Sequence, residues 1–163
     1  MPGDTSPGQQ EETTVSNVRE CDRRQGKLEV FNKARELAIY TIKICQNQNI
    51  FSPETDPVTV DNLRKNARDA YVLAWLGNNV RVRNEEDWKR RNAYQRDAID
   101  ACNALLVDIG MAKTIYHLRS RRVEYWAKMT VEVRNTLRKW NENDSMRYGK
   151  EKQYVSDGPQ RIE

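Results

Sequence analysis

The residues that could carry nucleophilic, acid–base or zinc chemistry are few and scattered. The chain has one histidine, His117, and three cysteines, Cys21, Cys45 and Cys102. A zinc site needs several such ligands at short spacings, and there is neither a CxxC pair nor a second histidine. His117 falls at the end of a predicted helix, where the helix dipole favours a protonated imidazole, which gives it a structural role. We expect the thiols to be buried or incidental in a reducing cytosol.

Acidic residues begin a metal-binding pattern without completing it. Glu85 and Glu86 resemble the start of the doubled acidic pair that binds magnesium in helical nucleotide pyrophosphohydrolases, but the next turn supplies Lys89 and Arg90. The later acids of this segment do not share one helix face: Asp97, Asp100 and Asp108. A P-loop, a GxGxxG, a nucleophile elbow and the Arg–His pair of helical toxin ribonucleases are all missing. We therefore predict a protein without catalytic residues, cofactor or metal.

Basic residues are the remaining chemical signal. The formal net charge is +4, and the basic excess falls between residues 27 and 139. Arginine outnumbers lysine there, which suits bidentate contacts with phosphate groups. This pattern favours a polyanionic partner such as RNA, and DNA or an RNA–DNA hybrid would offer the same phosphates.

The elements that must position these residues are helices. Apolar residues recur at spacings of three and four, which predicts helices over about 28–48, 57–81, 85–117 and 120–140. Asp56 followed by Pro57, and Asn84 followed by three acids, are typical helix starts. With only 7 Gly and 5 Pro in 163 residues, too few turn formers remain for a sandwich or barrel. The predicted fold is all-α, an up-and-down four-helix bundle.

The two ends of the chain differ from the middle in composition. Residues 1–26 are polar, with early Pro and Gly and no helical period, and residues 141–163 hold only scattered apolar residues. We expect a flexible arm, a bundle over 27–140 and a flexible tail whose first one or two turns could be helical. No apolar run of membrane-spanning length and no signal peptide occur, so a cytoplasmic protein is expected.

Alternating helices would bring basic residues together at one pole of the bundle, where the second helix ends, the third begins and the fourth ends. The predicted nucleic-acid-binding set is Arg81, Arg83, Lys89, Arg90, Arg91, Arg134, Arg138 and Lys139. A rival set at the opposite pole comprises Arg64, Lys65, Arg68, Arg119, Arg121 and Arg122.

The middle of the second predicted helix and a stretch of the third are apolar around the full circumference, which one bundle cannot bury. Residues 70–76 are unbroken apolar, and 104–107 repeat the pattern. Coverage by another subunit would explain this, with Trp75 as the anchor because large aromatics dominate interfaces. The predicted oligomer interface is Tyr71, Leu73, Trp75, Leu76, Leu106 and Met111.

Three segments carry a family resemblance: KLEVFNKARELAIY, RDAIDACNALLVDIGMAK and RRVEYWAKMTVEVRNTLRKW. They resemble the accessory variability determinant, the small four-helix-bundle accessory protein of bacterial diversity-generating retroelements. The resemblance implies a barrel-like, basic homopentamer that binds the retroelement's reverse transcriptase and template RNA. It would support mutagenic cDNA synthesis without catalysis of its own.

Two alternatives remain open. The bundle proteins encoded in ribosomal RNA intervening sequences form a sister family, whose second-helix signature does not occur in LRKNARDAYVLAWLG. A scaffold that binds protein only is the rival of another class. Salt-dependent binding to nucleic acid would separate it from the first hypothesis.

Overall fold

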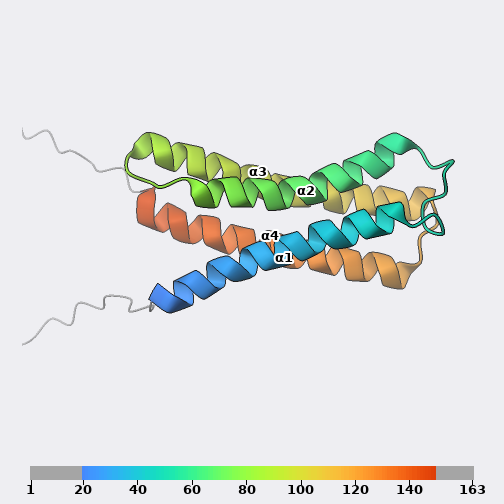
Figure 1. Ribbon diagram of the computed structural model, residues 1–163, viewed down its shortest axis with the longest axis horizontal. Coiled ribbons are helices and arrows are strands. Elements are labelled where there is room, and N and C mark those ends of the chain that lie inside the picture. The colour runs from blue at the N-terminus through green and yellow to red at the C-terminus, as the bar shows by residue number, and fades with distance from the viewer. Residues whose placement is uncertain (1–19, 150–163) are drawn as a thin grey trace, which may run out of the picture.

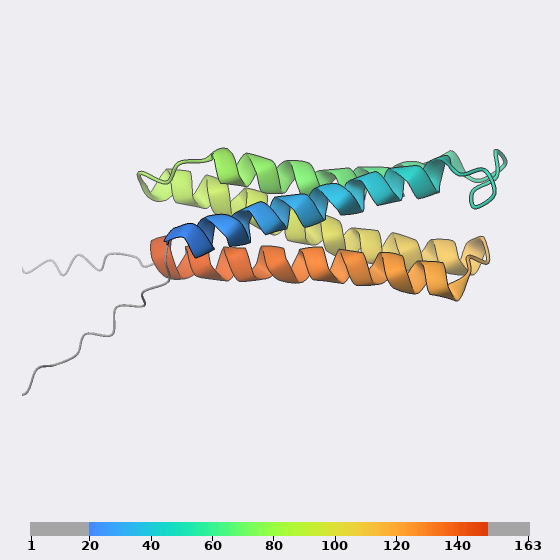
Figure 2. The ribbon, with the colours of Figure 1, turned by 60° about the horizontal axis from the view of Figure 1, so that its bottom comes forward.

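Four antiparallel helices form the part of the chain that the computed structural model describes, residues 20–149. They are α1 (Glu20–Gln46), α2 (Pro57–Asn79), α3 (Glu85–Ile115) and α4 (Ser120–Tyr148). Each helix packs against the next, and α4 returns to α1 (Figures 1 and 2). The all-α, up-and-down arrangement expected from the sequence is confirmed.

The helix ends differ from the predicted boundaries at both termini of the bundle. α1 begins at Glu20, so residues 20–26, expected in the arm, are helical. α4 continues through Tyr148, eight residues past the predicted end at 140. The expectations for residues 1–19 and 150–163 lie outside the described residues.

The start of each of the two middle helices follows from local chemistry. Asp56 Oδ1 accepts the Val58 N–H (3.2 Å), and Pro57 occupies the first helical position, where it needs no hydrogen bond. Asn84 Oδ1 accepts the Asp87 N–H (2.8 Å). Three acids in the first turn of α3 then face the positive end of its dipole.

The predicted apolar stripe of α4 forms one side of the core. All six of its residues are buried: Val123, Trp126, Thr130, Val133, Leu137 and Trp140. Trp126 Nε1 donates to Thr41 Oγ1 (2.8 Å), which satisfies a buried polar atom and ties α4 to α1. The next position in the same 3–4 pattern is Asp144, which is also buried.

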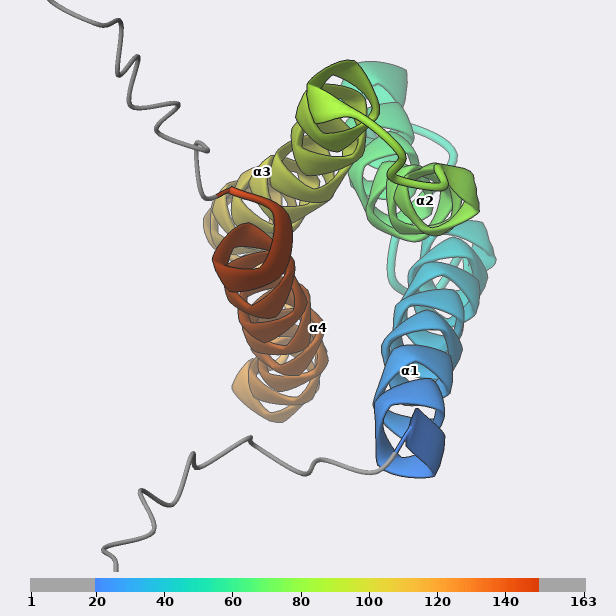
Figure 3. The ribbon, with the colours of Figure 1, turned by 90° about the vertical axis from the view of Figure 1, so that its left-hand side faces the viewer.

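The arrangement of the helices separates two long outer faces. Viewed along the bundle, α1 and α2 occupy one side and α3 and α4 the other (Figure 3). α2 and α3 pack together, and both bring small residues into the core, among them Ala67, Ala70 and Ala98, which are fully buried. None of the described helices has the length and apolar character needed to cross a bilayer.

His117 ends α3 in a left-handed conformation. Its φ is 51°, a value that costs a side chain about 1 kcal/mol or more and that glycine adopts freely. The Leu118 N–H donates to the Lys113 carbonyl (3.2 Å), and Leu118 is buried, as in a Schellman motif. The single histidine therefore serves as a helix terminator.

Replacing His117 with glycine should stabilise the bundle by about 1 kcal/mol, because glycine removes the cost of the positive φ. The midpoint of urea unfolding measures this change. His117→Ala, which keeps a Cβ, should give no such gain. A lower midpoint for His117→Gly would contradict the assignment.

Candidate functional site

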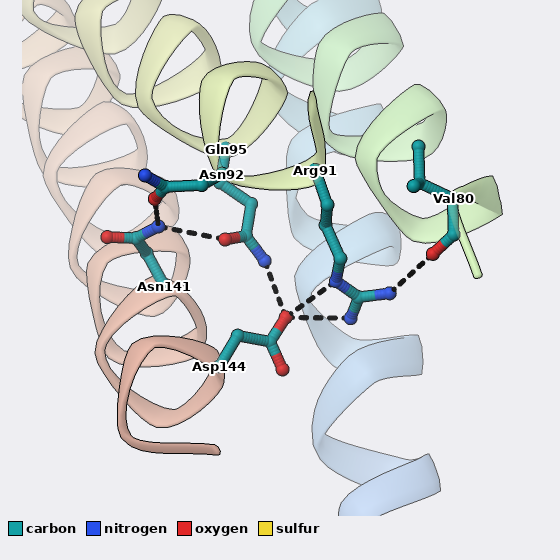
Figure 4. A network of polar contacts seen from close by, with 6 residues as sticks. All are labelled: Val80, Arg91, Asn92, Gln95, Asn141 and Asp144. Atoms are coloured by element: carbon teal, nitrogen blue, oxygen red, sulfur yellow. Dashed lines mark hydrogen bonds and ion pairs between the residues drawn. The ribbon is translucent and has the colours of Figure 1, made fainter. Parts of the chain in front are cut away.

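A buried ion pair joins three helices at one end of the bundle (Figure 4). Arg91 of α3 donates from Nη2 (2.7 Å) and Nε (2.8 Å) to Asp144 Oδ2 of α4. Arg91 Nη1 also donates to the Val80 carbonyl (3.1 Å), just past α2. The Arg91 and Asp144 side chains are only 6% and 8% exposed, so each charge depends on the other.

Amide side chains extend this ion pair into a network (Figure 4). Gln95 Nε2 donates to Asp144 Oδ2 (2.7 Å). Asn141 Nδ2 donates to Gln95 Oε1 (2.8 Å) and to Asn92 Oδ1 (2.7 Å). These side chains thus supply one another's hydrogen-bond partners, which polar groups removed from water require.

The structure places Arg91, a member of the predicted nucleic-acid-binding set, in the interior of the bundle. The residue is 5% exposed, and its guanidinium also lies 5.2 Å from the centre of the Trp140 ring. Asp144 pairs with this arginine because α4 continues for two turns past residue 140, the end of the predicted bundle. The sequence signal for this pair is a carboxylate four residues after Trp140, at a core position where a buried charge needs an oppositely charged partner.

The other arginines of the predicted pole remain at the surface. Arg81, Arg83 and Arg90 are exposed, while Lys89 pairs with Glu85 (2.6 Å). Glu86, Asp87 and Glu142 lie at the same end of the bundle. With Arg91 neutralised, the expected large positive excess is reduced to near balance at this pole.

The longer α4 also changes where its basic residues lie. Its eight additional residues lengthen the helix by about 12 Å. Arg134, Arg138 and Lys139 are therefore positioned along the side of the bundle and not at its tip. Lys139 follows Arg138 directly and so faces a different direction.

Three arginines instead form a group along the outer α3–α4 face: Arg96, Arg134 and Arg138. On α3, Arg96 shares a side with Asn92 and Asn103, four residues before it and seven after it. On α4, Arg138 lies four residues after Arg134 and three before Asn141, so these three side chains share one face of the helix.

Hydrogen bonds join the two rows at both ends. Asn141 bonds to Asn92 (2.7 Å), and Arg134 Nη1 donates to Asn103 Oδ1 (3.3 Å). Arg96 and Arg138, both exposed, therefore lie between the two joined ends. We call Arg96, Arg134 and Arg138 the α3–α4 arginine group; Arg96 was absent from the predicted set because it belongs to no pole.

The predicted interface residues do not form one patch. Trp75, Leu76 and Met111 are 49%, 39% and 53% exposed, whereas Tyr71 and Leu73 pack against the core and Leu106 is half-buried. The Trp75 ring lies 5.8 Å from that of Phe31 on α1, while Met111 belongs to α3.

A separate apolar row runs along α3 and contains one residue of the predicted interface, Met111. Val107, Met111 and Ile115 follow one another at spacings of four, and all three are more than half exposed.

Two described cysteines lie in the interior, and a hollow opens beside one of them. Burial raises the pKa of Cys45 to about 11 and that of Cys102 to about 12, so both thiols stay protonated near neutral pH. A hollow of about 400 Å³ lies beside the α1–α2 turn, against Cys45 and Arg64. Among the described residues no group of three potential metal ligands gathers.

No family model, curated protein or solved structure matches this chain. The structure therefore classifies the protein as a four-helix, all-α domain.

Removing the Asp144 charge should be strongly destabilising, because it leaves Arg91 buried and unpaired. We expect Asp144→Ala to lower the free energy of unfolding by about 3–5 kcal/mol. The double variant Arg91→Met/Asp144→Leu should recover most of this loss, since no uncompensated charge remains. Urea unfolding of the wild type, Arg91→Met, Asp144→Leu and the double variant gives the coupling energy of the pair.

The matched control is Glu142→Ala, an exposed carboxylate two residues away, which should change stability by no more than about 0.5 kcal/mol. Equal effects of the Asp144 and Glu142 substitutions would show that the ion pair contributes nothing.

Proposed function

We propose that the protein is a non-catalytic, basic accessory bundle that binds RNA and assists a retroelement reverse transcriptase. The observation that carries the RNA-binding part is the α3–α4 arginine group, which presents cations along a face. The polymerase partner rests on the family resemblance of residues 27–140. DNA or an RNA–DNA hybrid would be held by the same phosphate contacts.

The geometry of this group suits phosphate binding. The hydrogen bond to Asn103 holds the Arg134 guanidinium in place, and its buried Nε has no acceptor within the described residues. Arg96 and Arg138 have no ion-pair partner in the described part of the chain. Asp100 lies one turn after Arg96 and contributes one negative charge to the outer α3–α4 face. The three arginines outweigh it, so this face keeps a net positive charge. A guanidinium fork matches two phosphate oxygens at once.

Binding should depend on this face more than on overall charge. In the double variant Arg96→Glu/Arg138→Glu, two phosphate contacts are replaced by repulsion, so affinity for a duplex RNA at about 0.15 M salt should fall at least about tenfold. The slope of log affinity against log salt should decrease by about two. Fluorescence anisotropy with a labelled duplex over a salt series measures both.

The control reverses the same number of charges elsewhere, at Lys43 and Lys128, two exposed lysines. It should weaken binding by much less. An equal loss in the control, or in Arg119→Glu/Arg121→Glu, would place the site elsewhere. A wild-type protein that binds no RNA at low salt would favour the protein-only scaffold.

We also propose that the bundle self-associates, as the resemblance to a homopentameric family implies. The supporting observation is the row formed by Val107, Met111 and Ile115, since exposed apolar side chains on one helix face often mark a subunit contact.

Met111→Glu should place a charge in the centre of that row and lower the oligomer mass, while helical content persists. Sedimentation equilibrium at micromolar concentration gives the mass. Met146→Glu, at an exposed methionine of α4 (71%), is the matched control and should leave the assembly unchanged. A wild-type mass of 19.1 kDa would contradict self-association.

A further inference from the structure

The outer edge of α2 that faces α1 carries two arginines followed by two aromatic side chains. Arg64, Arg68, Tyr71 and Trp75 follow one another at spacings of four, three and four, so they lie along one side of the helix. Both ends of this row touch α1. Arg64 Nη2 donates to the Cys45 carbonyl (3.3 Å), and the Trp75 ring lies 5.8 Å from that of Phe31. Arg68 and Tyr71 therefore also border α1.

α1 adds a further cation to the same edge. Arg35 lies one turn after Phe31 and is exposed, as is Arg68 of α2. Neither arginine has an ion-pair or hydrogen-bond partner among residues 29–149. Arg64 is different, because Asp61 lies 3.6 Å from it and offsets its charge. Arg35 and Arg68 are thus the two uncompensated cations beside Trp75.

Trp75 is fixed in position and half open to solvent. Phe31 meets its indole edge to face, at an interplanar angle of 76°, which restrains the ring. Even so, 49% of the residue remains exposed. A restrained, exposed aromatic ring beside free guanidinium groups is the combination on which nucleic-acid bases stack while their phosphates are neutralised.

We propose that the row Arg68, Tyr71 and Trp75, with Arg35, is a binding site for single-stranded nucleic acid. A base stacks on Trp75, and the flanking phosphates contact Arg68 and Arg35. The strand must be single, because in a duplex each base is stacked on its neighbours and its face is covered. This inference rests on the proposed function and adds a second binding site to it. The two sites are separate, because α1 and α2 lie on the opposite side of the bundle from α3 and α4, which carry the α3–α4 arginine group (Figure 3).

Charge favours this occupant over a second copy of the chain. A two-fold contact through this edge would bring the Arg35 and Arg68 of one copy against those of the other. Like charges facing each other would oppose such a contact, whereas a polyanion is attracted by both arginines.

The test compares a labelled oligouridylate with a labelled RNA duplex of the same length, by fluorescence anisotropy on the full chain. Trp75→Ala should weaken oligouridylate binding about five- to hundredfold, the range found for loss of one base–aromatic stack. Duplex binding should be unchanged. Trp75→Phe, which keeps an aromatic face, should retain most of the affinity. Arg68→Ala should weaken oligouridylate binding and lower its salt slope by about one.

Other results would refute the single-strand site, alone or together with the proposed function. Equal oligouridylate affinity for Trp75→Ala and wild type, or equal losses on both probes, refutes the single-strand site. A fall in oligomer mass for Trp75→Ala by sedimentation refutes it too, because Trp75 then belongs to a subunit contact. Wild-type binding to the duplex alone refutes this site and leaves the proposed function standing. Binding to neither probe refutes both.

Discussion

The buried pair formed by Arg91 and Asp144 is the constraint on which one end of the bundle depends. A charge removed from water is tolerated only beside an opposite charge with its hydrogen bonds made, so the two side chains specify how α3 and α4 align. The bond to the Val80 carbonyl carries this constraint to the end of α2. Gly77 permits the close approach, since a Cβ there would lie only 3.3 Å from Tyr94 Cβ.

This constraint also decides which arginines are available to a ligand. Because Arg91 is committed to the interior and Arg134 and Arg138 lie along the side of the bundle, the predicted basic pole keeps little excess charge over its acids. Further cations lie along the two sides. Those on α3 and α4 accompany asparagines, whereas those on α1 and α2 accompany Trp75 and Tyr71. The two faces therefore differ in chemistry: one offers hydrogen bonds and charge for a backbone, and the other adds aromatic surface for bases.

Much of the fold could be predicted because its determinants are local. The 3–4 spacing from Val123 to Trp140 and the caps at Asp56 and Asn84 depend on neighbours within a few residues, and the structure contains them as expected. The role of Arg91 could not be predicted in this way, because its partner is 53 residues away in a segment too polar to be read as core. Arg96 was missed for a related reason: it comes together with the predicted Arg138 only through the register of α3 against α4.

The most direct test of the central claim is hydrogen exchange, followed by mass spectrometry, over the last two turns of α4, residues 141–148. If the ion pair holds this segment in the bundle, its amides should be protected in the wild type and should lose that protection in Asp144→Asn. The amides of residues 126–137 should remain protected in both proteins. Rapid exchange of 141–148 in the wild type, or unchanged protection in the variant, would contradict the account.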